Sequence, residues 1–221
     1  MVSQKVYKGK MPEKDMIIPG DPKGLPDDFL KVIVFIDNAY LLRLKNYLFK
    51  DKFKYSIKTF IDSLCFKQRL VAEKIFLYDA PPFQSRKTTE KEDEKRRKYD
   101  EYADIFRKQG IILREGRTQR IKIGNEFVFR QKGVDMLLGI DMVAVKEDFP
   151  EIKRIILLSG DSDFVPVIEK LRKQNIQVFL WTYFEKNRES AFSKSNELIK
   201  KIHNENTFRI SKEDFEKCKL K

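Results

Sequence analysis

Residues 153–167 of the chain read KRIILLSGDSDFVPV, and this stretch decides the fold. Its apolar run, residues 155–158, is short and β-prone, which indicates a strand buried on both faces, as in a parallel sheet. Ser159 and Gly160 end the run. The apolar residues that follow recur at helical spacing: Phe164, Val167, Ile168 and Leu171. The stretch therefore predicts a strand that gives way, through a tight turn, to a helix.

Two carboxylates, Asp161 and Asp163, lie in this turn, and two interpretations of them compete. Asp is an ordinary N-cap, and acidic residues in a first helical turn complement the helix dipole, so the turn alone is most simply a cap. Two further aspartates change the balance. Asp37 ends another apolar run, residues 32–36, and Asp135 opens a third amphipathic segment. Three elements thus deliver an Asp to what can be one carboxyl edge of one sheet, where ligands bind in open α/β folds.

Strand-like runs alternate with helical patterns along the chain. This alternation predicts an α/β fold with a mostly parallel sheet and helices on both faces. The expected strands are residues 31–37, 74–78, 111–114, 155–158, 177–181 and 208–210. A hairpin with its turn near Gly124 and Asn125 is also expected. Residues 134–145 are apolar nearly all round, as for a helix packed between other elements. Residues 1–28, with four prolines and little periodicity, are expected to form an N-terminal arm before one domain, residues 29–221.

The composition points to an anionic partner. The 221 residues include 46 Lys and Arg against 34 acids, a net charge of +12. Nucleic acid is the leading candidate, and the alternative is a highly charged surface of the kind that thermophilic proteins use. Cys65 and Cys218 form neither a disulfide framework nor a metal-ligand spacing. No secretory signal or membrane-length apolar run is present, which predicts a cytoplasmic protein without a membrane partner.

The sequence lacks the characteristic motifs of several enzyme classes. No Gly-x-Gly-x-x-Gly follows a strand and no Walker-type loop is present, which disfavours dinucleotide oxidoreductases and P-loop enzymes. The single histidine, His203, and the lack of a Gly-x-Ser-x-Gly elbow disfavour triad hydrolases.

A convergence of the aspartates would itself indicate a metal site. Two carboxylates ~4 Å apart repel by about 4 kcal/mol at an effective dielectric of 20, so a cluster needs protons or a cation. Carboxylate oxygens without His or Cys suit Mg²⁺ or Mn²⁺, and a metal-bound water can attack phosphorus in line. Basic residues would then hold the polyanion around the acids. Those expected at this edge leave strand ends or hairpins: Arg86, Lys87, Arg114, Arg117, Arg120, Arg130 and Lys132.

Three blocks of the sequence resemble a known family. They read VIVFIDNAYLL (residues 32–42), KGVDMLLGIDMVAV (residues 132–145) and IILLSGDSDFVPVIEKLRKQNIQVFLW (residues 155–181). Their order and approximate spacing are similar to those of the NYN domain, in particular the LabA-like branch of the PIN-like nucleases. The resemblance implies a three-layer α/β/α PIN-like fold with a central, mostly parallel sheet. It also implies a metal-dependent ribonuclease that uses Mg²⁺ or Mn²⁺ and binds RNA. PIN-like domains are often dimers, so a homodimer is an open alternative.

The same resemblance implies the roles of individual residues. The catalytic acids and metal ligands would be Asp37, Asp135, Asp161 and Asp163. Asn38 and Ser159 match positions that flank the site. Tyr40 stands where an Asn is usual, and its ring can stack on a base or fill the core. Asp141 matches another common acid, but it lies about 240° round a helix from Asp135, so both cannot face one site. Asp135, in the first turn, is favoured as the ligand, and Asp141 as a structural residue with a basic or backbone partner.

Two other functions stay open at this stage. The same scaffold can serve as an RNA-binding or interaction module that is catalytically weak or silent, although the presence of all four acids favours the enzyme. A phosphatase-like or receiver-like domain shares strands that end in Asp. It is disfavoured because no partner Lys/Thr constellation is found.

Overall fold

A computed structural model of the chain describes residues 29–50, 53–185, 190, 192, 196–202 and 206–220. The predicted arm, residues 1–28, lies outside the described residues. The core of the fold is a six-stranded parallel sheet with the strand order β3-β2-β1-β6-β7-β8. These strands are β1 (Leu30–Asp37), β2 (Leu70–Asp79), β3 (Ile111–Glu115), β6 (Arg154–Leu158), β7 (Gln177–Thr182) and β8 (Thr207–Arg209). The predicted α/β class is confirmed.

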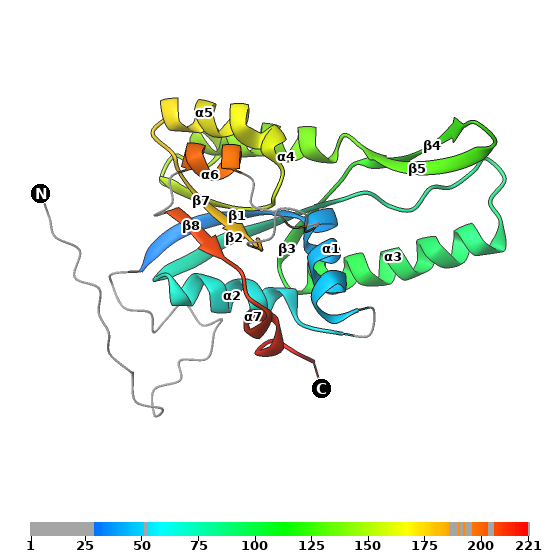
Figure 1. Ribbon diagram of the computed structural model, residues 1–221, viewed down its shortest axis with the longest axis horizontal. Coiled ribbons are helices and arrows are strands. Elements are labelled where there is room, and N and C mark those ends of the chain that lie inside the picture. The colour runs from blue at the N-terminus through cyan, green and yellow to red at the C-terminus, as the bar shows by residue number, and fades with distance from the viewer. Residues whose placement is uncertain are drawn as a thin grey trace, which may run out of the picture.

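Helices cover both faces of the sheet, which gives three layers (Figure 1). One outer layer contains α1 (Asn38–Phe49), α2 (Ile57–Lys67), α3 (Glu90–Lys108) and α7 (Lys212–Glu216). The other contains α4 (Val134–Asp148), α5 (Val165–Lys173), which the short 3₁₀ turn η2 (Ser162–Phe164) precedes, and α6 (Asn196–Ile202). None of the helices in the described part of the chain is long and apolar enough to cross a membrane.

Strand β1 lies at the centre of this arrangement and is buried on both sides. Val34 and Ile36 belong to the hydrophobic core on the α1/α2 side, and Ile33 and Phe35 to the core on the α4/α5 side. All four side chains are 0–1% exposed. A strand covered on both faces reads as a continuous apolar run, which is why the sequence of β1 shows no alternation.

The strand order reverses beside β1, and this reversal positions the site. From β1 the chain builds β2 and β3 on one side, then returns to build β6, β7 and β8 on the other. The crossovers therefore diverge between β1 and β6, which leaves a crevice at the carboxyl ends of these two strands. Asp37 ends β1, and Ser159 follows β6 directly.

A second, two-stranded antiparallel sheet projects from the body of the molecule beside α3 (Figure 1). It consists of β4 (Arg117–Ile123) and β5 (Glu126–Lys132), with its turn at Gly124 and Asn125, so the predicted hairpin is confirmed. At its root the Thr118 hydroxyl donates to the Pro81 carbonyl (2.6 Å). Gly133 then adopts a left-handed conformation (φ 81°) and starts α4.

Helix α4 differs from the sequence-based expectation that it is packed on all sides. It buries Val134, Leu138 and Met142 against the sheet, but Met136 and Ile140 are 68% and 56% exposed. The reason is that α4 belongs to an outer layer. The sheet covers one of its sides and α5 contacts one flank, so the remaining apolar side faces water.

Candidate functional site

Asp37, at the carboxyl edge of the sheet, is held by two hydrogen bonds. It caps α1, and its Oδ1 accepts a hydrogen bond from the Tyr40 backbone N–H (3.0 Å). The Ser159 hydroxyl donates to its Oδ2 (3.0 Å). Burial raises the pKa of Asp37, the two hydrogen bonds lower it, and the charge of Asp161 raises it further. The carboxyl group is thus rigidly held in surroundings that disfavour its charge, which a nearby cation would relieve.

The turn after β6 holds Asp161 and Asp163. The Asp161 backbone N–H donates to Ser159 Oγ (3.2 Å), and Oδ1 of Asp161 accepts from the Asp163 N–H (2.9 Å), which caps η2. Asp161 is therefore a cap, as the simpler interpretation held, and its second carboxylate oxygen has no hydrogen-bond donor among the described residues. At Gly160 a Cβ would lie 2.7 Å from Cε2 of Tyr40, so the turn can pass this ring only with glycine.

Asp135 lies near the other three acids and belongs to α4. It lies in the first turn of α4, directly after Gly133 and its neighbour Val134. Burial raises the pKa of Asp135, and the charges of the other three acids raise it further: Asp37, Asp161 and Asp163. The four acids predicted from the sequence therefore lie near enough to one another to interact electrostatically. We call this group the acid edge.

The acid edge fits a hard divalent cation in its donor chemistry, since it offers carboxylate oxygens. Among the described residues, however, no three acidic, His or Cys side chains are close enough to surround one metal ion. Mg²⁺ typically keeps several waters and is held by one or two carboxylates together with substrate phosphates. The arrangement thus suits an ion held partly by substrate, and not a closed cage made of protein alone.

Asp141, the second acid of α4, has different surroundings. Its carboxylate accepts from Nε of Arg114 (2.8 Å), from a terminal nitrogen of Arg114 (3.2 Å) and from the Tyr78 hydroxyl (2.8 Å). Burial raises the pKa of Tyr78, and so does the hydrogen bond to Asp141, so this phenol stays a donor. Asp141 thus joins α4 to β2 and β3. Arg114, one of the predicted phosphate-binding residues, is its partner.

Sequence reasoning missed Asp79, which ends β2 and is 6% exposed. It accepts hydrogen bonds from Asn38 Nδ2 (2.6 Å), Gln131 Nε2 (3.0 Å) and the Ala80 N–H (2.7 Å). It therefore orients Asn38, which precedes Tyr40 in α1, and ties the hairpin to the sheet. The available signal was that KIFLYD ends in Asp as VIVFID does. The Ala-Pro-Pro that follows Asp79 indicates only that the strand ends there.

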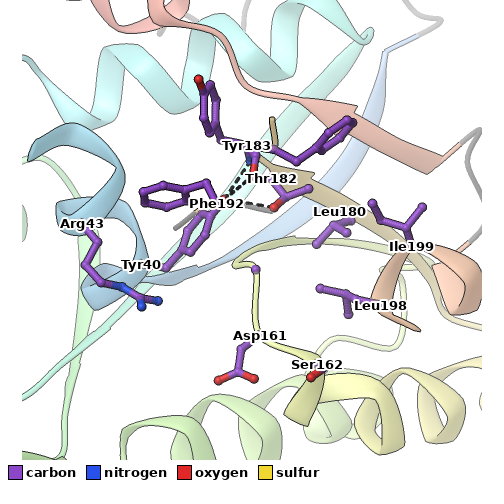
Figure 2. A pocket seen from close by; sticks show the side chains of 12 residues that line it. Tyr40, Arg43, Asp161, Ser162, Leu180, Thr182, Tyr183, Phe192, Leu198 and Ile199 are labelled. Carbon is purple, nitrogen blue, oxygen red and sulfur yellow. Dashed lines mark hydrogen bonds between the residues drawn. The ribbon is translucent and has the colours of Figure 1, made fainter. Parts of the chain in front are cut away.

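Tyr40 fills the core, one of its two predicted roles. It is 3% exposed, its hydroxyl accepts from the Tyr183 N–H (2.7 Å), and it shares a hydrogen bond with Thr182 Oγ1 (3.0 Å). A pocket of about 370 Å³ lies beside it. Figure 2 shows Arg43 and Asp161 on different sides of this pocket, so a cation and an acid of the edge both border it.

The remaining predicted phosphate-binding residues lie on exposed segments. Arg117, Arg120, Arg130 and Lys132 are on the hairpin, and Arg86 and Lys87 are in the loop between β2 and α3. Among the residues that the structure describes, no ion pair joins any of these six to an acid. Their charges are available to a partner.

Comparisons with known proteins agree with this architecture. The family model of the NYN domain matches residues 31–202. The crystal structure of a protein of unknown function from Vibrio parahaemolyticus RIMD 2210633 is similar, with a TM-score of 0.56 and 18% sequence identity over 89% of this chain and 100% of that one. At this identity the likeness concerns the fold. No curated protein matches the sequence. The match covers the strands and turns that carry all four acids, and the chain therefore belongs to the NYN domain family of the PIN-like nuclease superfamily.

Proposed function

We propose that the protein is a divalent-metal-dependent ribonuclease of the LabA-like branch that hydrolyses RNA phosphodiester bonds at the acid edge. The observation that carries this proposal is the effect of the other three acids on Asp135. The charges of Asp37, Asp161 and Asp163 all raise the pKa of Asp135. A protein with a net charge of +12 keeps these like charges together at the crevice between β1 and β6. A structural role alone would not require such a costly arrangement.

Each residue of the edge has a part in this chemistry. Asp37, held by the Tyr40 N–H and the Ser159 hydroxyl, is the fixed ligand. Asp161 keeps one oxygen on its cap and offers the other to the metal. Asp135, on α4, and Asp163, in η2, lie near enough to interact electrostatically and add to the negative field. When bound, Mg²⁺ or Mn²⁺ would supply a polarised water as nucleophile and stabilise the leaving oxygen.

A second function, RNA binding without cleavage, is supported by two observations. No three potential side-chain ligands surround one position in the described residues, and the hairpin cations carry no ion pairs there. A cleavage assay separates the two functions. We expect a fluorescent single-stranded RNA to be cut with Mn²⁺ or Mg²⁺ and to stay intact with EDTA. RNA that is retained on the protein but never cut with either metal would favour the binding module.

The partner RNA, the cytoplasmic location and the homodimer stay predictions. Single-stranded DNA in the same assay tests the choice of nucleic acid, because only RNA carries the 2′-hydroxyl that a protein can read. Sedimentation at several concentrations tests the dimer.

A further inference from the structure

The β4–β5 hairpin carries exposed aromatic rings as well as cations. Phe127 and Phe129 on β5 are 56% and 54% exposed. We propose that this hairpin is a stacking platform that binds the bases of single-stranded RNA beside the acid edge. The RNA in this proposal is the substrate of the proposed nuclease, but its binding is measurable without any cleavage.

The rings form a continuous series on one face of the hairpin. The antiparallel register places Arg120 opposite Phe129, and Lys122 opposite Phe127. The Arg120 guanidinium lies over the Phe127 ring (4.7 Å to its centroid) and over the Phe83 ring (5.0 Å). The Phe83 and Phe129 centroids are 5.6 Å apart. Aromatic rings and cations thus alternate on one surface, which is the composition of sites that bind single-stranded nucleic acid.

Packing explains only part of this series. An isolated two-stranded ribbon is marginally stable, so the contacts of Phe83 with Phe129 and Arg120 help to hold the hairpin against the loop before α3. A ring that served packing alone would be covered, however, and more than half of Phe127 and of Phe129 faces water. Contiguous exposed apolar surface of this kind is a feature of binding sites.

The platform is joined to the acid edge. Gln131 lies on the same face of β5 as Phe129, one step nearer the root, and donates to Oδ1 of Asp79 (3.0 Å). Asp79 also accepts from Asn38, the residue that follows Asp37. Same-face residues of a strand are about 7 Å apart, so the two rings begin within a few nucleotides of the acids. An RNA strand that runs from the acid edge along the hairpin therefore reaches the rings of Phe129 and Phe127.

The spacing favours a single strand over a duplex. Successive nucleotides of a duplex strand rise by about 3.4 Å, and their stacking hides the base faces. Rings about 7 Å apart can each accept a base only if the bases are unstacked from each other, as in an extended single strand. The register places Arg120 and Lys122 on the same face as the rings, where the phosphates of a bound strand would pass, and Arg117, Arg130 and Lys132 on the opposite face.

The test is a binding measurement in EDTA with the full chain, using a labelled single-stranded RNA and the same RNA annealed to its complement. The variant Phe127→Leu/Phe129→Leu keeps apolar contact with Phe83 and removes the ring faces. Stacking contributes about 1–3 kcal/mol per base, so we expect affinity for the single strand to fall by roughly 5–150-fold per ring. The salt dependence of binding should not change, because no phosphate contact is lost. Duplex affinity should be unaffected.

Two control variants sharpen the result. Phe127→Tyr/Phe129→Tyr keeps both ring faces and should bind single-stranded RNA as the parent does. Ile123→Ala removes an equally exposed apolar side chain from the other face of the hairpin (50% exposed) and should leave binding unchanged. Unchanged single-strand affinity in the Leu variant, or an equal loss for the duplex, would overturn the platform.

The parent protein gives an independent readout if the Leu variant does not fold. A fluorescent base analogue near one end of the RNA should be quenched on binding when it stacks on a ring, and an unquenched analogue at every position tried would contradict stacking. Failure of the proposed nuclease is distinguishable. An RNA that binds through the rings but is never cut would contradict the proposed nuclease activity and would still support the proposal that the hairpin binds RNA bases.

Discussion

The acid edge and the β4–β5 hairpin carry opposite charges and are built in opposite ways. Within the acid edge, Asp37 is 6% exposed and accepts two hydrogen bonds from the protein, whereas Asp135 and Asp163 are exposed. Asp79, beside the edge at the end of β2, is as buried as Asp37 and accepts three. The hairpin cations Arg117, Arg130 and Lys132 are exposed, and no ion pair within the described residues holds them. Groups that must meet a metal and a scissile phosphate need fixed positions, whereas groups that contact a flexible backbone do not.

The two regions also differ in what they cost the fold. Burial raises the pKa of Asp37 and of Asp79, so the charged forms of these two buried acids oppose folding. The exposed cations of the hairpin keep their hydration and cost little. Substitutions in the acid edge should therefore reduce cleavage without an equal loss of stability. Substitutions on the hairpin should each change RNA affinity by a small amount.

The largest effect is expected at Asp161. Substituting outer-shell partners of a metal site typically costs 10–100-fold, so Asp161→Asn, which removes a proposed ligand, should reduce Mn²⁺-dependent cleavage by more than about 100-fold. The fold should persist, because Asn also caps η2. Initial cleavage rates and circular dichroism check both points. Cleavage at the parent rate would show that Asp161 is only a cap.

The two acids of α4 should respond in opposite ways. We expect Asp135→Asn to reduce cleavage more, by roughly 10-fold or beyond, since it lies at the edge. Asp141→Asn should mainly destabilise, because it weakens the hydrogen bonds with Arg114 and Tyr78, at a cost of about 1 kcal/mol or a few degrees in Tm. Melting curves and cleavage rates for both variants test this. Equal losses of activity with equal Tm would remove the distinction.

Stability should depend on pH through Asp37. Its folded-state pKa is raised above the ordinary value of 3.8, so in the interval above 3.8 the folded protein keeps a proton that the unfolded chain has lost. The unfolded state then binds fewer protons, and the free energy of unfolding falls as pH rises through this interval. Asp37→Asn should lack this component. Denaturant midpoints of parent and variant that follow parallel pH curves would contradict the raised pKa.

The smallest effect is expected on the hairpin. Arg130→Gln/Lys132→Gln should remove one to two phosphate contacts. Each contact contributes about 0.7 to the slope of log affinity against log salt concentration for a single strand. The affinity for all RNA sequences should fall alike. The matched control is Lys217→Gln/Lys219→Gln, two exposed lysines near the chain end. Indistinguishable slopes would mean that the charge of +12 serves solubility.

Local patterns predicted the strands and the hairpin because each depends on its own residues. The apolar runs of β1 and β6 and the Gly124-Asn125 turn needed no knowledge of distant contacts. The exposed side of α4 could not be predicted, since an apolar helix does not reveal which of its sides lacks a neighbour. The angle of about 240° between Asp135 and Asp141 around the helix predicted that one of them has a structural partner. The identity of that partner, Arg114, depends on the position of β3, which the local sequence does not show.

Similar reasoning explains the outcome at the site. Asp37 and Asp161 could be grouped because the ends of parallel strands share an edge. Asp135 instead follows β5 of the antiparallel hairpin and opens α4, so its position does not follow from that rule. Asp79 was missed because its partners Asn38 and Gln131 are 41 and 52 residues away, and neither pairing leaves a local pattern. The core position of Tyr40 likewise depends on Tyr183, which is 143 residues away.

The pairing of β1 with β6 has a consequence for the order of events during synthesis. The bond from Ser159 to Asp37 closes a span of 122 residues, so the first acid emerges from the ribosome long before its partner. Strands β1, β2 and β3 pair with one another, and β4 pairs with β5, within the N-terminal part of the chain, whereas β1 gains its second neighbour only when β6 is made. We therefore expect a nascent or truncated chain to acquire its RNA-binding surface first and its full set of acids last. A chain interrupted before β6 would hold RNA without being able to cut it.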